Sequence, residues 1–286
     1  MSFEITTAMV KQYAGNVSLL SQQKGSRLRG AVRYEPIVGK EAYFDQIGAT
    51  TARKRTARHA DTPLISTPHS RRRVVPYDYD WADLMDPLDG KKVLISPEGK
   101  YAVNAGFAMG RAMDDEIISA FSGTAYTGVD GGTATSFDSN NQIAHGSAGL
   151  TITKLLEAKE ILDAGDIDPD IPRFIALPAS EVTTLLNTAE VKSADYNTVK
   201  ALAQGELDTF CGFKFIQIER LAVASSVRTC LAWAQDGMLL GVGADIKTDI
   251  GPRRDKNMAV QVYVNMSIGA TRMEEAKCVE IACWEG

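Results

Sequence analysis

The sequence predicts an α+β protein in which an extended, polar first third is attached to a compact body. Residues 1–76 contain only short apolar groups among recurring Gly, Thr and Pro, so they cannot bury a core of their own. A long helix is predicted between Pro97 and Phe121. Strands dominate the end of the chain, where residues 258–268 alternate strictly between apolar and polar side chains.

Charge is divided between these two parts. From Met1 to Pro76 there are 13 Lys and Arg against 5 Asp and Glu, whereas residues 77–286 have 18 against 31. The acidic part begins with residues 77–89, which contain five Asp and no basic side chain. A basic arm beside an acidic strip indicates a protein that is completed by its neighbours. The candidate inter-subunit contacts are Arg53, Lys54, Arg55, Arg58, Arg71, Arg72, Arg73, Asp78, Asp80, Asp83, Asp86, Asp114, Asp115 and Glu116.

Composition is ordinary for a soluble globular protein. The chain has 286 residues, 44% of them hydrophobic, and no apolar run approaches the roughly 18 residues of a transmembrane helix. The N-terminus lacks the basic and apolar parts of a signal peptide, so we expect a reducing cytoplasm and no membrane partner. The four cysteines form no C-x-x-C pair, and the odd offset between Cys278 and Cys283 puts them on opposite faces of a strand. We therefore expect structural thiols.

The first 80 residues are predicted to be an arm followed by an extended loop. A short helix over 5–13 is expected in the arm, where four glycines break anything longer. Pro63, Pro68 and Pro76 favour edge or turn positions in the loop. The loop is predicted to run outward over residues 47–58, turn over 60–70 and return over 71–79.

The long helix has clear start and stop signals. Ser96 is a cap residue, Pro97 suits the first helical position, and the helix should end near Gly123. Met109, Met113 and Ile117 recur every four residues, and the Ala and Gly residues between them let another backbone pack closely. Roughly 25 residues would span nearly 40 Å, which is long for a globular helix.

Shorter elements follow this helix. A loop or hairpin is expected over 124–149, and Gly165 should close a second helix. Ser180 should cap a third helix that runs through Leu186. The predicted helices are 153–164, 180–186 and 198–204, and the predicted strands are 173–177, 213–219, 227–234, 238–242, 258–268 and 277–284.

A search for catalytic or metal-binding chemistry yields no candidate, and we expect no enzyme, metal or cofactor. No nucleophile elbow, Walker loop or dinucleotide fingerprint is present, and all three histidines fall in predicted loops. Asp166, Asp168 and Asp170 imitate a calcium loop, but Ile171 stands where the turn glycine should be. The consecutive acids 114–116 point in different directions on a helix and do not converge on one metal.

The basic arm has two interpretations. Clustered arginine is typical of phosphate binding, but the few aromatic residues are not interleaved with it and the whole chain has a charge of −5. Pairing of the arm with an acidic surface on another copy is the favoured interpretation. Non-specific contact with DNA stays open.

Several local motifs now resemble those of a known family. The relevant stretches are 108–118 (AMGRAMDDEII), 155–162 (LLEAKEIL), 205–215 (GELDTFCGFKF), 267–272 (SIGATR) and 279–281 (VEI). Their order is that of an arm, an extended loop, a spine helix, a second helix, an axial domain and closing strands. In this order the chain resembles, over almost its whole length, the major capsid proteins of tailed double-stranded DNA bacteriophages.

The resemblance implies a fold with four parts and a structural function. The parts are an N-terminal arm (1–45), an extended loop (46–89), a peripheral domain with a long spine helix (90–168 and 250–286) and an axial domain (169–249). The implied function is self-assembly, as hexamers and pentamers, into the icosahedral shell that encloses the phage genome.

The implied partners follow from that function. They are other copies of the chain, a portal, a decoration protein as a further candidate, and packaged double-stranded DNA through non-specific contact. Because the chain starts directly at the arm, scaffolding is expected from a separate protein. The implied location is the virion, after assembly in the host cytoplasm.

Three alternatives stay open at this point. The shell protein of a bacterial nanocompartment would be built on the same fold class. A tail-tube or other ring-forming virion protein would need mostly strands and would lack the long helix. A hydrolase that uses scattered Ser and His residues is the least favoured.

Overall fold

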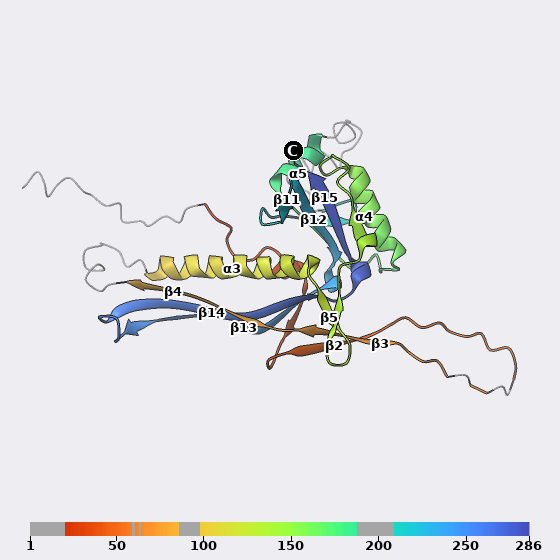
Figure 1. Ribbon diagram of the computed structural model, residues 1–286, viewed down its shortest axis with the longest axis horizontal. Coiled ribbons are helices and arrows are strands. Elements are labelled where there is room, and N and C mark those ends of the chain that lie inside the picture. The colour runs from red at the N-terminus through yellow and green to blue at the C-terminus, as the bar shows by residue number, and fades with distance from the viewer. Residues whose placement is uncertain (1–20, 59–60, 63, 86–97, 188–208, 286) are drawn as a thin grey trace, which may run out of the picture. The chain divides into compact units, whose positions relative to one another are not determined.

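The computed structural model describes residues 21–58, 61–62, 64–85, 98–187 and 209–285 (Figure 1). The predicted helices over 5–13 and 198–204, the cap at Ser96 and the acidic Asp86 lie outside the described residues. Two compact units divide the chain: residues 1–26, 77–113 and 244–267 form one, and residues 27–76, 114–243 and 268–286 form the other. Three long elements contribute residues to both units: α3 (Glu98–Ser122), β13 (Met238–Arg253) and β14 (Ala259–Arg272).

Helix α3 is the predicted long helix, and it ends directly before Gly123 as expected. Its stripe of large side chains is buried, each at most 3% exposed: Met109, Met113, Ile117 and Phe121. At Gly110 an added Cβ would collide with the backbone of Gly25 and Ser26. The small residues of α3 therefore let the chain's own arm approach closely.

The first sheet contains β1 (Arg33–Pro36), β13, β14 and β4 (Tyr77–Met85), in that order. The predicted alternation in β14 is confirmed, because Val262, Val264, Met266 and Ile268 are buried and the residues between them are half-buried. Strand β13 is much longer than the predicted 238–242. Its second half is exposed and polar, so it lacks the apolar signal that marks the first half.

The second sheet is mixed and lies against helix α4 (Ile152–Ala164) (Figure 1). Leu155, Ala158 and Leu162 from α4 share one core with Ile175 and Ile281 from the sheet. Helix α4 has the predicted end at Gly165, and the Thr151 hydroxyl accepts the Lys154 N–H at its start. The strands of this sheet are β7 (Gln142–Ile143), β15 (Cys278–Trp284), β12 (Val227–Ala234), β8 (Arg173–Leu177), β10 (Phe213–Gln217) and β9 (Thr209–Phe210), with β11 (Val223–Ala224) paired to β12.

Helix α5 (Ala179–Asn187) corrects one prediction. The helix begins before Ser180, so Ser180 is not its cap. Its first N–H, from Ala179, instead donates to the carboxylate of Glu219 at 2.7 Å. Glu219 lies two residues after the end of β10. The Ser180 hydroxyl donates to Glu285 at 2.7 Å.

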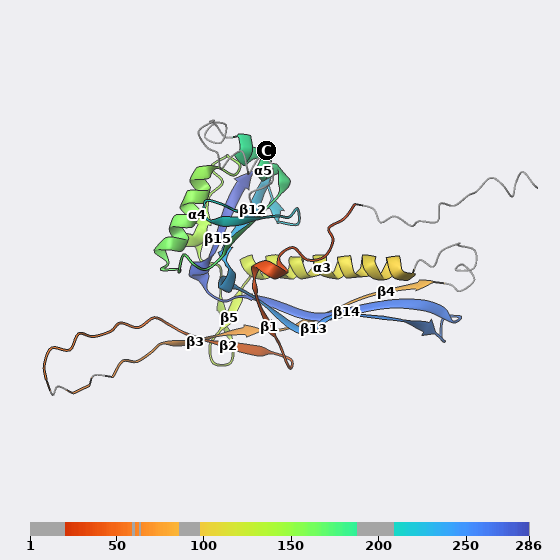
Figure 2. The ribbon, with the colours of Figure 1, turned by 180° about the vertical axis from the view of Figure 1, so that it is seen from behind.

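The third sheet contains β2 (Ala42–Ile47), β3 (His69–Val74), β5 (Ala125–Thr127) and β6 (Thr133–Thr135), in that order. The predicted outward leg over 47–58 does extend away from the sheet (Figure 2), but only Ile47 of it is paired in a strand, because β2 ends at that residue. Residues 48–58, 61–62 and 64–68 belong to a loop that extends away from β2 and β3 (Figure 2). The hairpin of β5 and β6 confirms the expectation for 124–149.

Part of the predicted arm packs into the interior of its own subunit. Leu28, Ala31, Val32 and Ile37 are each at most 4% exposed. The Trp233 indole donates to the Ala31 carbonyl at 2.8 Å. Short 3-10 helices complete the described elements: Arg29–Ala31, Ser139–Asn141, Gln235–Gly237 and Glu275–Lys277.

The cysteines agree with their predicted structural role. All four are free, and three of them are fully buried. Cys283 belongs to the core of the second sheet, whereas Cys278 faces away from that core, with its thiol 3.7 Å from the Gly237 carbonyl. No helix within the described ranges is long and apolar enough to cross a membrane.

Candidate assembly surfaces and a buried arginine cluster

Four of the predicted contact residues lie on the loop between β2 and β3. Arg53, Lys54, Arg55 and Arg58 are all exposed. Among the residues that the structure describes, Arg55 donates to the Ala57 carbonyl at 3.0 Å. Within the described residues none of the four is in an ion pair, so this loop presents uncompensated positive charge to solvent.

The Arg71–Arg73 triplet lies on β3, where alternation sends its side chains to two faces. Arg71 forms an ion pair with Asp45 at 2.5 Å, and its guanidinium lies 5.6 Å from the Tyr43 ring centre. This hydrogen-bonded pairing holds the pKa of Asp45 below its usual value. Arg73 lies 4.8 Å from the ring centre of Tyr126. Both outer arginines are therefore engaged by their own chain.

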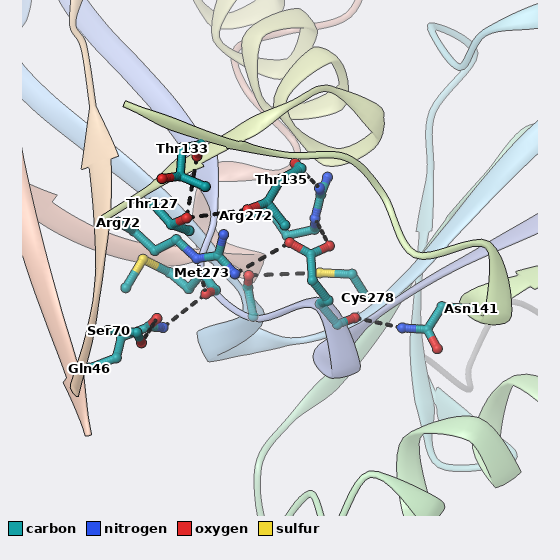
Figure 3. A network of polar contacts seen from close by, with 12 residues as sticks. Gln46, Ser70, Arg72, Thr127, Thr133, Thr135, Asn141, Arg272, Met273 and Cys278 are labelled. Atoms are coloured by element: carbon teal, nitrogen blue, oxygen red, sulfur yellow. Dashed lines mark hydrogen bonds and ion pairs between the residues drawn. The ribbon is translucent and has the colours of Figure 1, made fainter. Parts of the chain in front are cut away.

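Arg72 points to the other face and is only 7% exposed. Its Nε donates to the Met273 carbonyl at 2.7 Å, and its Nη2 lies 3.3 Å from Glu275 (Figure 3). Burial lowers the pKa of Arg72. One side chain of the predicted triplet thus ties the base of the loop to the turn that follows β14.

Arg272 completes this buried cluster (Figure 3). It is fully buried, pairs with Glu275, and donates to the carbonyls of Phe121 and Gly123, the latter at 2.9 Å. Its guanidinium also lies 5.0 Å from the ring centre of Phe137. Two buried arginines therefore share one carboxylate, and together they join β3, the end of α3 and the end of β14.

Amide side chains extend the cluster at its edges (Figure 3). Gln46 from β2 donates to the Met273 carbonyl at 2.9 Å, and Asn141 donates to the Glu275 carbonyl at 2.7 Å. The turn after β14 is thereby fixed to the third sheet through its backbone. Sequence reasoning missed Arg272. The alternation of β14 is no guide to it, because the pattern breaks after Ile268, where Gly269 and Thr271 are buried and Ala270 is half-buried.

The predicted acidic residues fall into three groups. Asp78 and Asp80 are exposed on β4, and the half-buried Asp83 accepts the Leu84 N–H at 2.8 Å. Asp114 is fully buried and accepts backbone N–H groups of residues 27 and 28 at 3.0–3.1 Å. Asp115 accepts hydrogen bonds from Nε and Nη2 of Arg220, one on each carboxylate oxygen.

The carboxylates of α3 thus diverge, as the sequence predicted. Asp114 faces the interior, Asp115 is half-exposed and Glu116 is partly buried. Across the described residues no three His, Cys, Asp or Glu side chains are close enough together to hold a metal. Asp168, from the calcium-like stretch, accepts the Asp170 N–H at 3.0 Å in a local turn.

Comparisons with known proteins agree on the fold. The capsid of cyanophage P-SCSP1u matches with a TM-score of 0.76 at 15% identity, covering 99% of this chain and 95% of that one. The head of Helicobacter pylori bacteriophage KHP40 matches with a TM-score of 0.76 at 9% identity, covering 99% and 98%. The capsid of Ralstonia phage GP4 matches with a TM-score of 0.75 at 9% identity, covering 97% and 96%. This is the tailed-phage capsid fold that the sequence predicted.

The family is shown by a separate comparison of the sequence. A search of curated proteins gives no significant match. The family model described as phage capsid protein, however, matches residues 5–285. Over nearly its whole length, therefore, the chain belongs to the phage capsid protein family.

Proposed function

We propose that copies of this shell-forming capsid subunit join through the exposed loop of one copy and the acidic strand of a neighbour. The observation that carries the proposal is the set of four exposed cations on residues 53–58, which have no ion pair in the described part of their own chain. Asp78 and Asp80 on β4 offer exposed charge of the opposite sign. Pairing of these two surfaces would set the orientation and register of neighbouring subunits.

The other predicted contacts are weaker candidates for this role. Arg72 and Asp114 are buried, and Arg71 and Asp115 already have partners in their own chain. An inter-subunit contact through any of these would have to break an existing one. The loop cations have no such competing partner, so we assign the neighbour contact to them first.

Family membership makes the chain a structural, self-associating component of the virion. Neither the nanocompartment alternative nor the hydrolase is favoured, and the 25-residue helix α3 speaks against a tail tube. We further propose association as hexamers and pentamers, with heterologous contacts around each ring. The division into arm (1–45), loop (46–89), peripheral domain (90–168 and 250–286) and axial domain (169–249) is retained as part of this proposal.

The remaining partners are proposed on the resemblance and on charge. A separate scaffolding protein, a portal and a decoration protein would act during assembly in the host cytoplasm. Packaged double-stranded DNA would meet the shell through non-specific contact with phosphates. The exposed loop cations support such contact, whereas the net charge of −5 limits its strength.

The test reverses charge on the loop and then restores complementarity. Arg53→Glu with Arg55→Glu should leave a folded subunit that assembles poorly, as judged by electron microscopy and sedimentation. Adding Asp78→Arg and Asp80→Arg should recover assembly, since the attraction is then reversed in sign but intact. Lys159→Glu with Lys247→Glu, which changes two exposed lysines elsewhere, is the matched control. Normal particles from the loop variant would contradict the proposal.

A further inference from the structure

The outer face of the third sheet has the composition of an interaction surface. The register places Tyr43 opposite Arg73, and Arg73 opposite Tyr126, so the three side chains share one face across β2, β3 and β5. Ile47, at the end of β2 on the same face, is 69% exposed. Tyr and Arg are the residues most enriched where protein interfaces gain their affinity.

The charges on this face are already satisfied within it. Arg71 pairs with Asp45, and Arg73 lies 3.9 Å from Glu41. A partner for this face therefore has no charge deficit to fill. Besides the uncharged-polar Ser70 and the imidazole of His69, the exposed groups left for it to cover are apolar and aromatic, which distinguishes this face from the cationic loop.

A preformed hollow lies at one end of the face. It has a volume of 390 Å³ and is lined by Asp45, His69, Ser70, Arg71, Gly128 and Val129. Val129, in the turn between β5 and β6, is 80% exposed at its rim. The turn is held over the sheet by Arg71, which donates to the Val129 carbonyl at 3.3 Å. The Tyr43 hydroxyl also lies 3.3 Å from the Asp130 carbonyl, although its shorter hydrogen bond, 2.9 Å, is to Glu41.

The same chain carries an exposed apolar group that needs cover. Leu64 is 98% exposed and Ile65 is 49% exposed, on a loop whose other residues are polar, charged or small, or proline. In its own chain this segment does not reach the hollow, since Leu64 makes almost no contact and the loop extends away from β2 and β3 (Figure 1). An exposed leucine gains free energy only when another surface buries it.

We propose that Leu64 and Ile65 of one copy dock into the hollow beside Val129 of a second copy. The contact is heterologous, since a knob on one subunit enters a hollow on the next, and such contacts build rings and shells. The inference rests on the proposed function, because both use the loop. It adds an apolar contact, which we call the lock, between Leu64 and Ile65 of one copy and the third sheet of another, on a different surface from the acidic strand. The charge pairing of the loop cations with β4 would orient neighbouring subunits, and burial of Leu64 would supply most of their affinity.

Cysteine crosslinking tests this docking directly. Particles of a Leu64→Cys, Val129→Cys chain, oxidised with copper phenanthroline, should give a ladder of covalent multimers on a non-reducing gel. The unassembled subunit should give none, and neither should Leu64→Cys with Val223→Cys, where Val223 is a half-exposed valine on β11. Each single cysteine variant controls for pairing with Cys211. Intact particles without a ladder, or a disulfide within one chain, would overturn the inference.

A second variant keeps the test decisive if the double cysteine chain does not assemble. Leu64→Asp should weaken subunit association by about tenfold or more, whereas Leu64→Met should keep it. Leu64→Asp particles that form normally would refute the lock. If those particles form normally while Arg53→Glu with Arg55→Glu does not assemble, only this inference fails and the charge pairing stands. If the loop reversal assembles normally and Leu64→Asp does not, the charge pairing fails and the lock stands.

Discussion

Glu275 is the carboxylate on which the buried arginine cluster depends, and Glu275→Gln is the sharpest perturbation of it. The substitution keeps the shape of the side chain and removes its charge. Arg272 and Arg72, whose side chains are 0% and 9% exposed, would then be two buried cations without a counter-ion. Their mutual repulsion, together with lost hydrogen bonds, should destabilise the folded subunit.

The size of the effect can be estimated from the geometry. Removing one partner of a buried ion pair costs about 3–5 kcal/mol. The lower end applies here, about 3 kcal/mol, because Glu275 is 20% exposed and Arg272 keeps its bonds to the carbonyls of Phe121 and Gly123. Glu274 provides a matched control, since its pair with Lys277 is 51% exposed on the carboxylate side. Glu274→Gln should cost at most about 1 kcal/mol.

Urea unfolding of the purified, unassembled subunit measures both variants. The Glu275→Gln midpoint should fall clearly below that of Glu274→Gln, and a thermal scan should separate the two by roughly 4 °C. The double variant Glu275→Leu with Arg272→Met should recover part of the loss, because it removes one of the two buried arginine charges that Glu275→Gln leaves without a counter-ion. Equal midpoints for the two single glutamine variants would refute the reasoning.

Three further predictions concern positions away from this cluster. Gly131→Ala should cost roughly 1–3 kcal/mol, because Gly131 has φ +60° and an added Cβ would lie 2.7 Å from Arg73; Gly132→Ala, with nothing nearby, should be almost neutral in the same unfolding assay. Burial raises the pKa of Glu181, so the protonated side chain stabilises the fold at low pH and this stabilisation is lost as pH rises through the folded-state pKa. Glu181→Gln, which stays uncharged, should therefore gain stability relative to wild type from about pH 4 to pH 7. A stability difference between the two proteins that does not change with pH would contradict the assignment. In the folded subunit at about pH 8, an alkylating agent should modify Cys211 alone, since the other three thiols are fully buried; mass spectrometry of native and unfolded samples would reveal any exception.

The predictable parts of the fold are those where the apolar pattern is local and complete. Strands β8 and β12 match their predicted bounds, because each is a short run of apolar or β-branched residues. Helix α3 could be predicted because its large apolar residues recur every four positions and Gly123 marks its end. The prediction ended strand β13 too early, at Val242. The outer half of this strand is held by backbone pairing with neighbouring strands rather than by apolar side chains.

The candidate site was harder to predict, because burial of a charged residue depends on partners far away in the sequence. Arg272 and Asp114 are buried only because the Glu275 carboxylate and the backbone N–H groups of residues 27 and 28 neutralise or bind them. Charge counts treat such residues as surface groups. The alternation along β14 gave no signal for Arg272 either, since it breaks at Gly269.

The Arg71–Arg73 triplet shows why the basic arm cannot be treated as one surface. Consecutive residues on a strand face opposite sides, so Arg72 stabilises the fold while Arg71 and Arg73 form the outer face. Reversing all three together would disrupt folding and the outer face at once, and a loss of particles would then identify neither cause. The loop cations 53–58 lie beyond the paired strands and are exposed, so we expect their reversal to leave folding intact and to test assembly alone. The same reasoning makes Leu64 informative, because a residue that is 98% exposed in the subunit can matter only through contact with another molecule.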